Sequence, residues 1–148
     1  MFRGTATVKV DDKGRLKLPA HIKERLDARY GAESMYFVTS ITGDIVLVYP
    51  LSEWERIEET LSQAPQFDKL KKKFLFQANQ YGAEAGLDEQ GRLLVPGKLR
   101  EQAGMKGEVK LNWETNHIEV LSQARYETEA EQNRLSSEDF ENLAKLGI

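Results

Sequence analysis

The chain contains one nine-residue segment twice. Residues 11–19 read DDKGRLKLP and residues 88–96 read DEQGRLLVP, 77 positions apart and without a gap. In both copies an aspartate precedes an arginine by four residues, and a glycine, which can take positive φ, stands between them. A polar turn repeated between apolar stretches indicates two copies of one small unit. We therefore expect a pair of related surfaces rather than one enclosed pocket.

Each turn lies in a stretch whose apolar residues alternate as in a β-hairpin. Val8 and Val10 precede the first turn, and Leu16 and Leu18 follow it, so one face of the hairpin is apolar. A proline, a short helical pattern and two further β-rich runs complete each copy. A copy of about 45 residues is too small to bury a stable core alone. We therefore predict a β-rich α+β fold in which the hairpins of the two units interleave about a pseudo-twofold axis, with covering helices.

Four segments are expected along the chain. They are a first unit over 5–50, connecting helices over 51–80, a second unit over 81–124 and an acidic C-terminal tail over 125–148, weakly helical or disordered. Aromatic residues of the connector are expected to pack in the core or between the copies, and these are Trp54, Phe67 and Phe74. The run of lysines at 69–73 is expected to be the solvated face of an amphipathic helix.

The composition excludes several kinds of site. The chain has no cysteine, so it has neither a disulfide nor a thiolate-ligated metal, and its two histidines lie apart from any carboxylate cluster. No apolar run approaches the ~18–20 residues that span a bilayer. We expect a cytoplasmic protein with no metal, no cofactor, no membrane partner and no small-molecule substrate.

Charge is distributed unevenly along the chain, although the net charge is only −3. Residues 1–30 hold eight Lys and Arg against four Asp and Glu, whereas residues 125–148 hold three against six. Binding depends on the local potential rather than on the sum. A nucleic-acid partner is therefore compatible with the basic front of the chain.

The polar side of the first hairpin carries four cations and one anion. A two-stranded ribbon is narrow enough to enter the DNA major groove, and the planar fork of Arg15 can donate to guanine O6 and N7 together. Asp11, across the turn, would hold that fork in one orientation. Lysines suit phosphate contacts, which add affinity and register. The candidate DNA-binding residues of this copy are Lys9, Lys13, Arg15 and Lys17, with Asp11 as the orienting residue.

The second copy keeps the motif as Asp88, which orients, and Arg92, a further DNA-binding candidate. Three lysines of the first copy are replaced here, by Gly86, Gln90 and Leu94. We predict that the first copy supplies most of the attraction for DNA, and that Leu94 serves packing or a subunit contact. A single Asp–turn–Arg segment is usually a surface hairpin with a local ion pair; its repetition at a fixed offset favours a functional role.

These features resemble the MraZ family of bacterial transcriptional regulators, whose tandem units belong to the AbrB-type swapped-hairpin fold. The likeness covers roughly residues 1–126 and rests on Met1-Phe2-Arg3-Gly4, Asp11-x-Lys13-Gly14-Arg15-Leu16, Leu18-Pro19, Tyr49-Pro50-Leu51-x-Glu53-Trp54, and Asp88-x-x-Gly91-Arg92-Leu93-Leu94 with Pro96. The resemblance implies a nucleoid-associated regulator that binds repeated G-rich boxes in double-stranded DNA upstream of the division and cell-wall gene cluster, including its own gene. It also implies a ring-shaped homo-oligomer in which the Asp-x-x-x-Arg elements contact DNA.

The duplicated turn is also compatible in outline with two other classes of function. Paired aspartates about a twofold axis also occur in aspartic proteases, but arginines near Asp11 and Asp88 would keep both carboxyls ionised, so we expect no enzymatic activity. The alternative is a protein-binding module of the same fold, an antitoxin-like or scaffold protein that holds its partner with the acidic tail. Antitoxins of this fold are typically single-copy dimers, whereas this chain carries both copies itself.

Overall fold

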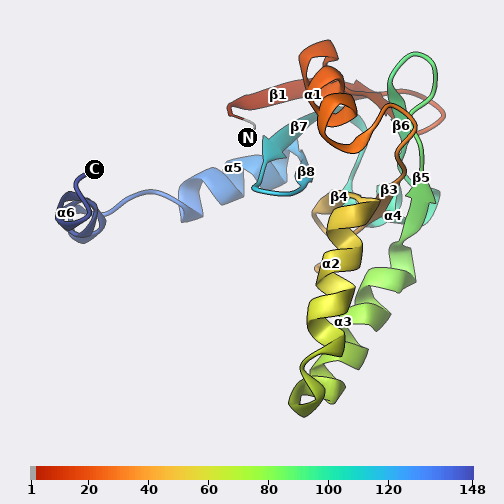
Figure 1. Ribbon diagram of the computed structural model, residues 1–148. Helices are drawn as coiled ribbons and strands as arrows, with labels where there is room; N and C mark the ends of the chain where they lie inside the picture. The colour runs from red at the N-terminus through yellow and green to blue at the C-terminus, as the bar shows by residue number, and fades with distance from the viewer. Residues whose placement is uncertain (1–2) are drawn as a thin grey trace.

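Two strand–turn–strand–helix units, each followed by a strand pair, build the fold. The computed structural model describes residues 3–148, so Met1 and Phe2 of the start motif lie outside the described residues. In chain order (Figure 1) the elements are β1 (Thr5–Val10), β2 (Arg15–Lys17), α1 (Ala20–Tyr30), β3 (Tyr36–Thr39), β4 (Val46–Pro50), α2 (Leu51–Ser62), the 3₁₀ turn η1 (Pro65–Phe67), α3 (Asp68–Tyr81), β5 (Ala83–Ala85), β6 (Arg92–Leu94), α4 (Gly97–Ala103), β7 (Gly107–Trp113), β8 (Ile118–Ser122), α5 (Gln123–Gln132) and α6 (Ser137–Lys145).

Within the described residues, eight strands form one antiparallel sheet in the order β5-β3-β4-β8-β7-β1-β2-β6. Strands of the two units pair with each other: β1 with β7, β3 with β5, β2 with β6 and β4 with β8. The second turn joins the edge strands β5 and β6, so the sheet curls into a near-barrel. The predicted mixed α+β class is confirmed, and each unit completes the sheet of the other.

The strand register reveals a pseudo-twofold axis. Leu16 pairs with Leu93, its own equivalent 77 positions later, and both side chains are fully buried. The second copy is five residues shorter in its middle, so the equivalent of Leu47 is Glu119. These two residues also pair with each other. Because side chains alternate across a strand, burial of the two leucines turns their strand neighbours outward. The axis therefore fixes which residues of the two repeated motifs face solvent.

The helices cover the sheet at equivalent places in the two units. α2 follows β4 and lies against β3 and β4, whereas α5 follows β8 and lies against β7 and β8. Trp54 of α2 is buried as predicted, with its ring 4.8 Å from that of Phe37 and 5.8 Å from that of Phe74. The prediction that Phe67 is packed is wrong, because its side chain is more than half exposed. Figure 1 gives the reason: the α2–α3 hairpin projects beyond the sheet, and Phe67 lies at its far end.

Candidate nucleic-acid interface

The first turn is organised by a single carboxylate. Oδ1 of Asp11 accepts hydrogen bonds from the backbone N–H groups of Lys13, at 3.0 Å, and Arg15, at 2.9 Å. Oδ2 accepts from Nε of Arg15 at 2.9 Å. Gly14 has a φ of 84°, a value that residues other than glycine rarely adopt. Its N–H donates to the carbonyl of Asp11. Asp11 therefore fixes the backbone of the turn and the orientation of the guanidinium together.

The second turn repeats this geometry. Asp88 accepts from the backbone N–H groups of Gln90 and Arg92 at 2.9 Å each, and from Nε of Arg92 at 2.7 Å. One contact has no counterpart in the first turn: Nη2 of Arg92 donates to Oε1 of Gln90 at 3.2 Å. The guanidinium of Arg92 is thus held by both Asp88 and Gln90, whereas that of Arg15 is held by Asp11.

The two motifs form one continuous ribbon, so the expected pair of related surfaces lies side by side on one strand pair. In the β2·β6 pair, Arg15 is opposite Leu94 and Lys17 is opposite Arg92. Directly opposed residues of an antiparallel pair share a face, so these four side chains lie on the outer face while Leu16 and Leu93 fill the core. The side chains of Arg15 and Arg92 are 28% and 30% exposed. Both predicted arginines are therefore partly open to solvent on a surface built equally by the two units.

The remaining predicted lysines flank this ribbon. Lys13 is exposed in the first turn, and Lys17 is exposed at the end of β2. Lys9 is exposed on β1, where alternation from buried Val10 places it on the same side of the sheet as Arg15. Its partner across the β1·β7 pair is Glu108, an opposite charge that reduces the local positive potential. Lys9 therefore stands opposite an acid on the neighbouring strand.

Two further cations reach the turns from the helices of the opposite unit. The guanidinium of Arg100 on α4 covers the first turn so closely that a Cβ on Gly14 would overlap with it. Lys23 on α1 covers the second turn in the same way, with Cδ 3.0 Å from a Cβ built on Gly91. Lys23 and Arg100 are themselves 77 positions apart. A cation at the same place in both copies was the signal that could have found them.

The chain matches proteins of known family over its whole length. A family model described as "MraZ protein, putative antitoxin-like" matches residues 1–77 and 82–146. Relatives named "Transcriptional regulator MraZ" are 43% identical in Acidobacterium capsulatum and 38% identical in Koribacter versatilis, each over 148 residues covering 100% of both chains. A relative of the same name in Pediococcus pentosaceus is 34% identical, again over 100% of both chains.

The chain belongs to the MraZ family of transcriptional regulators. The resemblance drawn from the repeated turn is thereby confirmed. MraZ proteins are regulators and not enzymes, in agreement with the expectation that the chain has no catalytic activity. The match of the family model in two parts agrees with a chain built from two related units.

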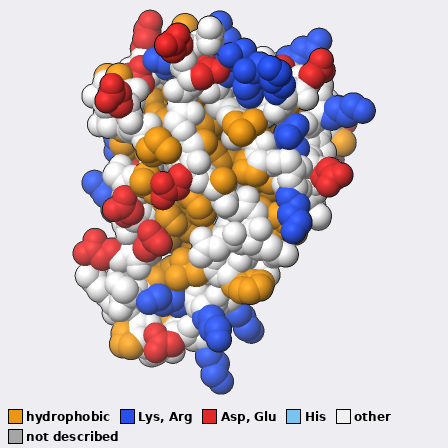
Figure 2. All heavy atoms as spheres, turned by 90° about the vertical axis from the view of Figure 1, so that its right-hand side faces the viewer, with side chains coloured by type: hydrophobic (Ala, Val, Ile, Leu, Met, Phe, Trp, Pro, Cys, Tyr) orange, Lys and Arg blue, Asp and Glu red, His pale blue; other side chains and the backbone are white. Residues whose placement is uncertain are grey.

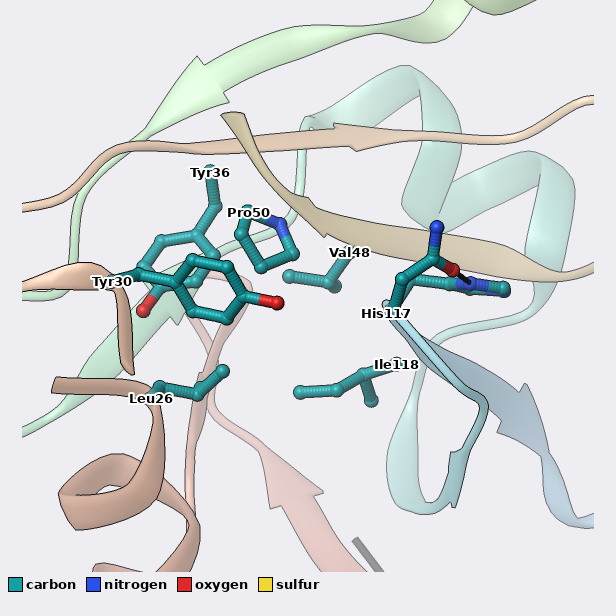
Figure 3. Close-up of a pocket in the computed structure, with 8 residues that line it drawn as sticks. Leu26, Tyr30, Tyr36, Val48, Pro50, His117 and Ile118 are labelled. Carbon is teal, nitrogen blue, oxygen red and sulfur yellow. Dashed lines mark hydrogen bonds between the residues drawn. The ribbon is translucent and has the colours of Figure 1, made fainter. Parts of the chain in front are cut away.

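The cavity enclosed between α1, β4 and β8 of this MraZ-family chain is too small to hold a ligand. The space between α1, β4 and β8 has a free volume of ≈ 10 Å³, which is about one water molecule. Figure 3 shows the apolar side chains of Leu26, Val48 and Ile118 pointing into it, with the ring of His117 at one side. No group of three His, Cys, Asp or Glu within residues 3–148 could hold a metal ion. None of the helices in this range is long and apolar enough to cross a membrane.

Acid titration provides a direct test of the turn geometry. Hydrogen bonds from the backbone N–H of Arg15 and from its side chain hold the pKa of Asp11 below its ordinary value of 3.8. A lowered pKa in the folded state means that this contribution to stability is complete above pH 3.8 and is lost as pH falls through the folded value. In Arg15→Ala we expect the pKa of Asp11 to rise but to stay below 3.8, because the backbone N–H, the larger cause, remains. NMR titration of the carboxyl carbon measures this, with Arg134→Ala as the control. A pKa of 3.8 or above in the unmodified protein would contradict the structure of the turn.

Proposed function

We propose that this MraZ-family regulator binds double-stranded DNA sequence-specifically through the β2·β6 ribbon. Its sites would be repeated G-rich boxes upstream of the division and cell-wall gene cluster, including its own gene, so it would act at the nucleoid in the cytoplasm. The observation that carries the proposal is the partly exposed guanidinium of Arg15, held by Asp11 on a two-stranded ribbon. A ribbon of this width fits the major groove.

The contacts divide by chemistry. The bond to Asp11 engages Nε of Arg15 and not the terminal Nη groups, which are the atoms suited to donate to guanine O6 and N7. Because the side chain is already oriented, binding costs less rotamer freedom. Lys13 and Lys17 would contact phosphates and set the register, with Lys9 contributing at the edge of the interface. Arg100 would add a fifth positive charge beside the first turn.

The first motif would supply most of the attraction. Gln90 already accepts a hydrogen bond from Nη2 of Arg92, so this guanidinium must lose a partner before it contacts a base fully. Leu94 stands where the first copy has Lys17, and removes a phosphate contact. Arg92 would therefore contribute less than Arg15 to the affinity for DNA, whether it contacts a base or only orients the ribbon. Asp88 would hold it, as Asp11 holds Arg15.

The chain would work as a ring-shaped homo-oligomer. One ribbon makes few contacts, and several linked ribbons on spaced boxes gain affinity through high effective concentration. We propose residues 5–50 and 81–124 as the two units of AbrB-like swapped-hairpin type that build the ribbon. Residues 51–80 would connect them, and residues 125–148 would form the acidic C-terminal tail, which begins within α5, the helix that lies against β7 and β8.

A second candidate function is a protein-binding module, antitoxin-like or scaffolding. The description of the matching family model includes the words "antitoxin-like", and the tail carries exposed apolar residues. In this case the chain would co-purify from its own cell extract with a different protein in fixed ratio. A regulator that acts on DNA would purify alone and would still bind its own upstream region.

Salt dependence tests the proposed DNA interface. With three to four phosphates neutralised per chain, log K should fall against log salt with a slope of about −3 per engaged chain. Mobility-shift titrations at several KCl concentrations, on a duplex from upstream of the protein's own gene, give this slope. A scrambled duplex of the same length is the control. Affinity that does not change with salt would exclude the electrostatic interface proposed here.

A further inference from the structure

The last helix, α6, stands apart from the rest of the molecule. Figure 1 shows it at the end of an extended connection, away from the sheet and from the α2–α3 hairpin. Its beginning is fixed by its own sequence, because Ser136 and Asp139 form a reciprocal capping box. Phe140 is nevertheless 59% exposed. α6 is therefore a helix with a capped N-terminus whose apolar side is exposed to solvent.

The sequence of α6 suits a helix that docks on another surface. Phe140, Leu143 and Ala144 follow the spacing i, i+3, i+4 and form an apolar stripe. The other residues of the helix include three acids and one base: Glu138, Asp139, Glu141 and Lys145. An isolated helix shorter than about 12 residues is marginal in water. Burial of the stripe against a partner would supply the missing stability, and the partner should be basic.

A surface with the complementary properties lies on α3. Lys69, Lys72, Lys73 and Phe76 follow the spacing i, i+3, i+4, i+7 and line a shallow depression with Gln77. Phe76, the aromatic residue of this lining, is 67% exposed. Figure 2 shows Lys and Arg side chains gathered around the end of the molecule that the α2–α3 hairpin forms. The opposite face of α3 is already used, since Phe74 stacks on Trp54 and Ala78 is fully buried.

The basic face of α3 and the acidic helix α6 are placed for contact between chains. They project in different directions from the sheet (Figure 1), so α6 does not lie near α3 of its own chain. Each chain offers one donor helix and one acceptor face. A contact between two different surfaces of identical chains is head-to-tail, and it produces a closed ring when the rotation closes.

We propose that α6 of one copy docks on the face of α3 formed by Lys69, Lys72, Lys73 and Phe76 of the next copy. Phe140 and Leu143 cover Phe76, and the acids of α6 lie beside the three lysines. The inference rests on the proposed homo-oligomer and names the surfaces that join it. Ring closure makes every contact support the others through effective concentration.

Two complementary variants test the contact. The acceptor variant Lys72→Glu/Phe76→Asp keeps its own α6, and the donor variant Phe140→Asp/Leu143→Asp keeps its own α3 face. All four positions lie outside the core, so both variants should fold. Light scattering coupled to size-exclusion chromatography measures the mass. We expect unmodified protein to be larger than two chains and each variant alone to have the mass of one chain, 16.9 kDa.

The mixture of the two variants is the decisive sample. The intact α6 of the acceptor variant can dock on the intact α3 face of the donor variant, and no further contact is possible. We expect the mixture to have twice the mass of one chain. Variants that keep the unmodified mass, an unmodified protein that is a single chain, or a mixture that stays at one chain would each overturn the inference. Met35→Asp, a charge placed on another exposed apolar residue, is the control and should leave the mass unchanged.

DNA binding separates this inference from the proposed function. Both variants keep Arg15 and Lys17, so each should bind a duplex with one box like the unmodified protein at equal chain concentration. Arg15→Ala should bind that duplex more weakly and keep its full mass. If the acceptor variant kept its mass and lost single-box binding, the lysines of α3 would be a DNA surface and the docking inference would be wrong. If Arg15→Ala kept its binding, the proposed function alone would fail.

Discussion

Arg15→Ala should weaken binding to a duplex with one box roughly tenfold to a hundredfold, because a bidentate contact to guanine is worth about 1–3 kcal/mol. The guanidinium is held by Asp11 in the orientation it would use, so its loss removes a contact that needs little further ordering. On a duplex with several boxes the loss should be greater, because each chain of the oligomer loses the same contact. Fluorescence anisotropy at fixed salt measures both dissociation constants.

Three matched variants make this result specific. Arg15→Lys keeps the charge and removes the planar fork, so it should restore non-specific binding more than specific binding. Arg92→Ala should have the smaller effect of the two arginine variants, since Gln90 already engages its Nη2. Arg134→Ala removes an exposed arginine of the tail, paired with Glu131, and should leave affinity unchanged. A larger loss in Arg92→Ala than in Arg15→Ala would show that the first motif is not the dominant one.

Leu16→Ala should lower the free energy of unfolding by about 2–5 kcal/mol, the usual cost of truncating a fully buried leucine. Leu16 lies on the pseudo-twofold axis opposite Leu93, and both side chains have no exposed surface. The β2·β6 pair that they stabilise joins the two units, and carbonyls of both turns extend it: Gly91 accepts from the N–H of Leu18 and Gly14 from that of Val95. The effect should therefore reach the whole sheet.

Urea unfolding followed by circular dichroism and by tryptophan fluorescence tests this expectation. Trp54 reports on the first half of the chain and Trp113 on the second. Circular dichroism and tryptophan fluorescence should give the same single transition, and Leu16→Ala should shift it equally in both signals. Leu94→Ala, on the half-exposed outer face of the same strand pair, is the control and should change stability by less than about 0.5 kcal/mol. Separate transitions for the two probes would show that the units fold independently.

The local parts of the interface could be predicted because their causes are local. An aspartate, a glycine and an arginine within five residues are sufficient to form the turn, since the carboxylate reaches the N–H groups and the guanidinium of its own loop. Alternation likewise identified Leu16 as inward and Lys17 as outward. The repeat then implied that the second turn follows the same rules, and Asp88 and Arg92 do so.

Other features depended on contacts between distant segments. The pairing of β2 with β6 merged two expected surfaces into one, because the core accepts Leu16 and Leu93 only when these strands lie side by side. Arg100 and Lys23 reached the turns from the helices of the opposite units. Phe67 was expected to be packed because it is an aromatic residue of the connector, but residue type does not tell where a helix leaves the body of the molecule. Each of these outcomes depends on residues far apart in the chain.

Nine residues, written twice, contain the turn, its carboxylate and its guanidinium, and this chemistry needs nothing from the rest of the chain. The joining of the two copies was decided in three dimensions, by a register that buries one leucine from each copy on the twofold axis. The physical reason is the difference in range. A hydrogen bond within a turn is specified by neighbours in sequence, whereas burial of apolar surface is shared by segments 77 residues apart and is satisfied only by the complete sheet.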